Sequence, residues 1–168
     1  MEKIEIRERK REDITEFCEF LYKLDSEAEF MLFEKGERNI DKEDILKKID
    51  DIADSGNICN IAKVENSIIG YAVAVREKFI RTKHVANIVI GILEDYCGKG
   101  IGTLFFQDIL DWADKNEVKR LELTVIAENK RAINLYKKYG FKVEGIKEKA
   151  TFKDGKYYDE LYMAKILD

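Results

Sequence analysis

Three glycines within five positions, in YCGKGIGTLFF at residues 96–106, separate an apolar stretch from a segment with helical periodicity. The stretch before them, HVANIVIGIL, has the apolar content of a largely buried strand. After the helical segment, RLELTVI alternates apolar with polar side chains, as a half-buried strand does. The predicted strand, helix and strand are residues 84–93, 100–115 and 120–126. Because strands joined through a helix pair in parallel, this region predicts a β-α-β unit within a sheet.

Periodic segments on both sides of this unit complete the predicted fold. The other predicted elements are a strand at Ile4 and Ile6, a helix from an Asp13 cap to Leu24, a helix from an Asp41 cap to Gly56, strands at 58–64 and 68–76, a helix at 129–139 with Gly140 as its stop, and a hairpin at Asp154-Gly155. This order predicts an α/β (α+β) fold with a mixed central sheet of about seven strands flanked by about four helices. We expect a single domain over residues 1–168.

Composition excludes several classes of function. The net charge is −4 with a pI near 5.3, so the chain lacks the basic patch that nucleic-acid binding needs. No apolar run approaches the roughly 18 residues of a membrane span, and the charged start MEKIEIRERKRED is unlike a signal peptide. Cys18, Cys59 and Cys97 are odd in number and far apart, which favours reduced thiols in a cytoplasmic protein. One histidine and no ligand cluster predict no metal site.

The glycines allow three interpretations apart from a tight turn without a ligand. A dinucleotide-binding fingerprint needs glycine where Thr103 stands, and its acidic partner should close the next strand, whereas Glu122 lies near that strand's start. A P-loop needs Gly-Lys-Ser/Thr at its end, whereas Lys99 stands at the beginning. The third interpretation is a simpler anion site. Backbone N–H groups at a helix start, without Cβ atoms in the way, form a cradle for a phosphate or pyrophosphate.

Two ordered motifs resemble those of one enzyme family. The loop Cys97-Gly98-Lys99-Gly100-Ile101-Gly102 is similar to the Gln/Arg-x-x-Gly-x-Gly/Ala loop of the GNAT N-acetyltransferases. ENKRAINLYKKYGF, at residues 128–141, is similar to that family's Asn-x-x-Ala-x-x-Leu-Tyr-x-x-x-Gly-Phe pattern. The ending DGKYYDELYMAKIL also resembles a closing hairpin of family members that modify ribosomal proteins or small molecules. The resemblance extends along nearly the whole element order.

The resemblance implies acetyl-coenzyme A as the acetyl donor. Three strand residues would lie along its pantetheine arm and offer an N–H to the oxyanion: Ile90, Gly91 and Ile92. Six loop residues would hold the pyrophosphate: Gly98, Lys99, Gly100, Ile101, Gly102 and Thr103. Asn129 would bind the cofactor's amide arm, and it suits a helix N-cap equally well. Tyr136 would give a proton to the departing thiolate, although its place on an apolar helix face also fits a core tyrosine.

Two departures from the family pattern concern the loop and the general base. Cys97 replaces the usual glutamine or arginine; it is either a small filler or a thiol made reactive by the helix start. Many relatives have a glutamate on the preceding strand, where this chain has Asn87. His84 lies roughly 26 Å along an extended strand from Ile92, too far to serve without a bend. The remaining carboxylates are candidates by type only: Glu94, Asp95, Glu122 and Glu144.

The acceptor side of the site is predicted at residues 27–38 and at the final hairpin. There Phe30, Met31 and Phe33 form an apolar wall and Glu34 and Glu37 face an amine, unless the former are core and the latter surface. The prediction is an acetyl-coenzyme A-dependent N-acetyltransferase that transfers directly to a primary amine of a small molecule or protein, with no nucleic-acid or membrane partner. The alternative is a non-catalytic acyl-coenzyme A-binding sensor on the same fold. A homodimer would be in keeping with the family, although no residue pattern in the sequence points to one.

Overall fold

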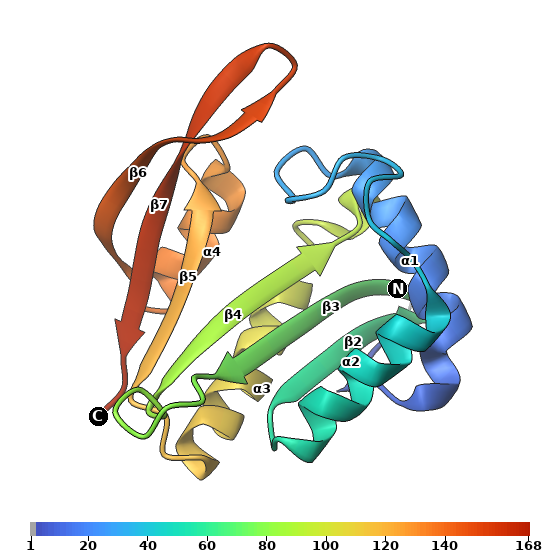
Figure 1. Ribbon diagram of the computed structural model, residues 1–168, viewed down its shortest axis with the longest axis horizontal. Helices are drawn as coiled ribbons and strands as arrows, with labels where there is room; N and C mark the ends of the chain where they lie inside the picture. Colours follow the sequence, from blue (N-terminus) through green and yellow to red (C-terminus); the bar gives the residue numbers. More distant parts are fainter. Residues whose placement is uncertain (1–2) are drawn as a thin grey trace. The chain divides into compact units, whose positions relative to one another are not determined.

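The computed structural model describes residues 3–168, and the predicted order of strands and helices is confirmed (Figure 1). The elements are β1 Ile4–Glu8, α1 Ile14–Glu27, α2 Lys42–Asp54, β2 Ile58–Val64, β3 Ser67–Arg76, β4 Val85–Ile92, α3 Ile101–Lys115, β5 Arg120–Ile126, α4 Lys130–Lys138, β6 Lys142–Lys153 and β7 Lys156–Ile166, with short 3-10 turns η1 Arg11–Asp13 and η2 Glu94–Tyr96. The strands form a mixed sheet in the order β1-β2-β3-β4-β5-β7-β6. β4 and β5 run parallel, as the β-α-β prediction requires.

The chain divides into two compact units. Unit 1 contains the residues up to Val75 together with Val89–Trp112, and unit 2 contains Arg76–Ile88 and Ala113–Asp168. The single-domain expectation stays a prediction. In the described part of the chain, no helix combines the length and apolar character needed to cross a membrane.

In unit 1, helices cover both faces of the strands (Figure 1). Successive side chains of β3 point to opposite faces and so meet different helices. On one face, the ring of Tyr71 meets Phe17 and Phe20 of α1 edge-on, with centroids 5.9 and 5.7 Å away. On the other face, a Cβ added to Gly70 would lie 3.3 Å from Phe105 of α3. α3 is also tied to the sheet by polar contacts, since Asn60 Nδ2 donates to Asp108 at 2.7 Å. The two apolar faces enclose the core of this unit.

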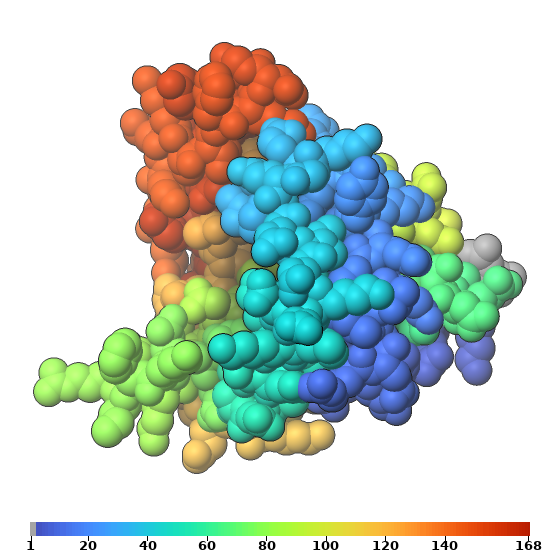
Figure 2. All heavy atoms as spheres, turned by 45° about the vertical axis from the view of Figure 1, so that its right-hand side comes forward, coloured from blue at the N-terminus to red at the C-terminus, as the bar shows by residue number. Residues whose placement is uncertain are grey.

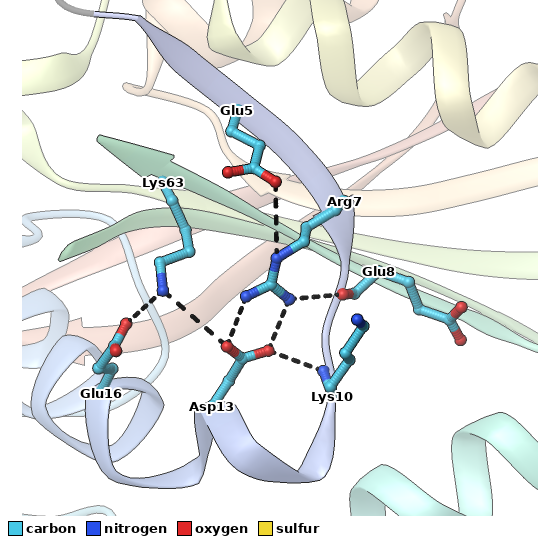
Figure 3. Close-up of polar contacts among 7 residues, drawn as sticks. All are labelled: Glu5, Arg7, Glu8, Lys10, Asp13, Glu16 and Lys63. Carbon is cyan, nitrogen blue, oxygen red and sulfur yellow. Dashed lines mark hydrogen bonds and ion pairs between the residues drawn. The ribbon is translucent and has the colours of Figure 1, made fainter. Parts of the chain in front are cut away.

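The caps of the first two helices differ from each other. Asp41 caps α2 as predicted, since its carboxylate accepts from the N–H groups of Glu43 and Asp44. The Asp13 prediction was wrong in its chemistry: the residue stands at the start of α1, but its carboxylate makes no bond to that helix. It accepts instead from the Lys10 N–H and from both terminal nitrogens of Arg7 (Figure 3). A guanidinium fork satisfies both carboxylate oxygens, which outcompetes a single cap bond.

Unit 2 is built on antiparallel pairing of β5, β7 and β6. Leu121, Leu123 and Val125 are buried, which confirms the alternation of this strand. The predicted hairpin turn is confirmed at Asp154 and Gly155, whose φ angles are 50° and 75°. In α4 the buried residues are Ile133 and Tyr136, which confirms that Tyr136 lies on the apolar face of this helix.

Candidate active site

The glycine turn that precedes α3 exposes backbone. Gly98 and Gly100 have φ angles of +75° and +85°, which L side chains rarely adopt, and a Cβ on either would meet nothing within 4 Å. Gly102 is different, because it lies inside α3 and is buried. The Leu104 N–H donates to Gly100 O at 3.2 Å, so the helical hydrogen bonding starts here. The N–H groups of a first helical turn have no acceptor within the helix and carry the positive end of its dipole.

Contacts within unit 1 hold this turn in place. The N–H of Leu93 donates to Ile69 O at 2.9 Å, and the N–H of Glu94 donates to Oε1 of Glu27 at 2.7 Å. The η2 turn then redirects the chain toward α3. The Lys99 ammonium lies 4.8 Å from the centre of the Tyr96 ring, at the exposed rim of the turn. The turn is therefore a backbone cradle with one cation beside it.

Cys97 turns its thiol toward the protein. Its Sγ lies 3.7 Å from Ile92 O, close enough for a weak S–H hydrogen bond, and the residue is half-buried. This contact fits the interpretation of Cys97 as a filler that joins the turn to the end of β4. Cys18 and Cys59 are buried, and burial raises the pKa of the Cys59 thiol to about 11. A thiol with that pKa is protonated and unreactive at neutral pH.

Near the end of β4, the position of Gly91 has no room for a side chain. A Cβ on Gly91 would lie 2.6 Å from Cε1 of Tyr71 and 2.8 Å from Cδ2 of Leu24, so a side chain at this position would collide with both. Ile90 and Ile92 on either side are half-buried. The three residues predicted to lie along pantetheine therefore occupy consecutive positions at the end of one strand, in the same unit as the glycine turn.

Unit 2 contains the second motif. Asn129 caps α4 through Oδ1, which accepts from the Ala132 N–H at 3.2 Å, so the N-cap role is confirmed. Tyr136 is buried, with 8% exposure, and its ring lies 5.9 Å from that of Phe141. Burial raises the pKa of Tyr136 to about 12. The phenol therefore keeps its proton at every pH at which the enzyme would be assayed.

The carboxylates considered as general bases differ in their partners and in their place in the structure. Arg120 binds both Glu122 and Glu144, and this contact lowers the pKa of the Glu144 carboxyl. Both are thereby engaged in a surface ion pair, whereas Glu94 and Asp95 are exposed beside the glycine turn. The His84 side chain is exposed, and its carbonyl accepts from the N–H groups of Lys119 and Arg120.

Glu77 was missed by the sequence analysis. Asn87, the residue at the position of the family's glutamate, donates from Nδ2 to Oε1 of Glu77 at 2.8 Å. Glu77 thus brings a carboxylate beside a position that lacks one. The signal is the chain reversal between β3 and β4, where the Glu77 N–H donates to Val85 O at 2.9 Å and so brings Glu77 beside the start of β4. Among residues 3–168, no three or more His, Cys, Asp or Glu side chains are grouped to hold a metal ion.

The segment between α1 and α2 lies over the surface of unit 1 (light blue in Figure 2). Phe30, Met31 and Phe33 are half-buried rather than core residues, while Glu34 and Glu37 are exposed. Oε2 of Glu37 accepts from the Glu34 N–H at 2.9 Å, so this carboxylate closes a local turn. The apolar side chains thus form a partly exposed surface, as a wall would require.

Residues 18–141 match the acetyltransferase (GNAT) family, and the chain belongs to that family. It is 31% identical over 107 residues to the L-amino acid N-acetyltransferase AaaT of Escherichia coli (strain K12), an alignment that covers 63% of this chain and 66% of the relative. The chain spans less than two thirds of the length of this and two other curated relatives that it matches.

Solved structures share the fold over nearly the whole chain. A GNAT-family acetyltransferase from Streptococcus pneumoniae is 27% identical with a TM-score of 0.93, covering 98% of this chain and all of the other. The yncA protein of Salmonella typhimurium, solved with its cofactor acetyl-CoA, is 18% identical with a TM-score of 0.86, covering 98% and 94%. The mixed seven-stranded sheet with four helices is therefore the GNAT fold.

Proposed function

We propose that this protein is an acetyl-coenzyme A-dependent N-acetyltransferase that transfers the acetyl group directly to a primary amine of a small molecule or protein. One observation carries the proposal: this chain, which belongs to the GNAT family, has an open glycine turn with positive φ angles just before α3. The AaaT relative is named for L-amino acids, so these are the first acceptors to test.

The glycine turn fits a pyrophosphate. The space in front of Gly98 and Gly100 is open, as a phosphate lying against backbone requires. N–H groups of residues 98–103 would donate to its oxygens, and the Lys99 ammonium would add a point charge at the rim. In this proposal residues 90–92 line the pantetheine arm, and Asn129 uses its side-chain NH₂ for the cofactor while Oδ1 caps α4.

The residues supply two proton positions for the transfer. Bound acetyl-coenzyme A contributes an acetyl group activated as a thioester. Tyr136 holds a proton at Oη that can pass to the sulfur as the C–S bond breaks. Glu77, fixed by Asn87, takes a proton from the ammonium of the acceptor so that the N–C bond can form. In net terms one ammonium proton ends on the sulfur and another goes to solvent.

The test is release of free coenzyme A thiol from acetyl-coenzyme A with each L-amino acid, with peptides, and with N-blocked amino acids as controls. We expect amine-dependent release, and a mass increase on the amine product by mass spectrometry. Glu77→Gln should lower kcat, because the base is then lost. Cys97→Ala should stay active, since direct transfer needs no acyl-enzyme. Tight binding of acetyl-coenzyme A without transfer to any amine would contradict the proposal and favour the sensor.

A further inference from the structure

The segment at residues 28–41, between α1 and α2, contains no fully buried side chain. Every residue in it is half-buried or exposed, and Leu32 is 76% exposed. Irregular backbone with so little apolar burial is ordinarily among the least stable parts of a protein. Polar contacts therefore carry more weight in ordering this segment than they do in the helices beside it.

A buried ion pair supplies that polar contact. Arg38 donates from Nε to Oδ2 of Asp25 at 2.7 Å and from Nη2 to Oδ1 at 2.8 Å, a bidentate pair. The Asp25 side chain is 1% exposed and that of Arg38 is 19% exposed. Burial is the largest single influence and disfavours the guanidinium cation, but the hydrogen bond to Asp25, the charge of Asp25 and the influence of Tyr71 together raise the pKa of Arg38. The guanidinium also lies 4.3 Å from the centre of the Phe33 ring.

This pair connects the segment to the end of β4. The Arg38 guanidinium also interacts electrostatically with the hydroxyl of Tyr71, which is buried. The ring of Tyr71 lies directly against Gly91, and so does Leu24, the neighbour of Asp25 on α1. Figure 1 shows the segment (blue to cyan) at the end of unit 1 toward which the β4 arrow points. Arg38, Asp25, Tyr71 and Gly91 thus form one continuous set of contacts within unit 1.

We propose that Arg38 is a positioning residue for the amine acceptor. Clamped by Asp25, it fixes Phe33 and the rest of residues 28–41 against Tyr71, and so sets the acceptor-side wall next to Gly91. This inference rests on the proposed function, because Gly91 belongs to the strand end assigned to the cofactor. Arg38 does not touch the reacting atoms; it acts through the segment that it holds.

The test compares Arg38→Lys with Arg7→Lys. Lysine keeps the charge but loses the fork that grips both carboxylate oxygens. Arg7 and Asp13 are a matched pair, also bidentate at 2.6 and 2.7 Å around a carboxylate that is 4% exposed (Figure 3). They lie in the same unit but belong to β1 and η1. Both variants are assayed at a temperature at which each is fully folded.

We expect Arg38→Lys to raise the KM for the best L-amino acid by roughly tenfold to a hundredfold, because a small displacement of a positioning segment is costly. The KM for acetyl-coenzyme A should stay unchanged, and amide hydrogen exchange should speed up over residues 28–41. Arg7→Lys should change neither. Equal acceptor KM values and equal exchange in the two variants would overturn the inference alone. A wild-type protein that acetylates no amine would overturn the proposed function and this inference together.

Discussion

Tyr136→Phe is expected to lower kcat by roughly a hundredfold to ten-thousandfold, the usual contribution of a well-placed general acid. The variant loses only the hydroxyl oxygen and keeps the buried ring beside Phe141. Acetyl-coenzyme A should therefore bind as before, and KM should hardly change. Fixed-time assays of coenzyme A thiol release, at saturating donor and acceptor concentrations, measure this change in kcat.

Tyr139→Phe is the control for this prediction. Tyr139 is the C-cap residue of the same helix, α4, and it is half-buried. It should retain full activity. Because the pKa of Tyr136 is raised to about 12, its ionisation should produce no fall in the wild-type rate in ordinary assay buffers. If Tyr136→Phe turns over like the wild type, Tyr136 is a core residue and the proton comes from elsewhere.

Gly98→Asp is expected to weaken acetyl-coenzyme A binding by about a hundredfold or more, since placing like charges together costs several kcal/mol. The new carboxylate would stand in the open space where the pyrophosphate is proposed to lie. Isothermal titration calorimetry with coenzyme A measures the change directly.

Gly155→Asp separates this charge effect from backbone strain. Gly155 has the same φ of +75° as Gly98, and a Cβ there also meets nothing within 4 Å. Both substitutions therefore impose the same conformational cost, but Gly155 lies in the β6–β7 turn. Equal loss of coenzyme A binding in the two variants would show that strain, rather than the cradle, governs the result.

Local patterns explain what could be predicted of the fold. The bounds of β2 and β5 agree with the sequence analysis, because strand periodicity and flanking turn residues are local signals. Asp41 needed only its own helix to act as a cap. Asp13 was wrong because Arg7, six residues away, competes for its carboxylate. A pattern along one helix does not include such competitors.

The candidate site, too, was predictable from the sequence only in part. The glycine turn and Asn129 were predictable, since conformational freedom and a capping oxygen are properties of the residue type and its place. Glu77 beside Asn87 and Arg38 on Asp25 were not. Each pair joins residues ten or more apart whose meeting depends on strand register or on the path of an irregular segment. Those paths are settled by packing, which a single sequence does not display.

Thermal unfolding of the wild-type protein with acetyl-coenzyme A, coenzyme A, ATP and NAD tests the central claim most directly. At a ligand concentration about a hundred times Kd, binding to the native state should add about 2.7 kcal/mol to the free energy of unfolding. We expect both coenzyme A forms to raise Tm by several degrees and ATP and NAD to have no comparable effect. No shift with either coenzyme A form would contradict the cradle, and with it the proposed acetyltransferase activity.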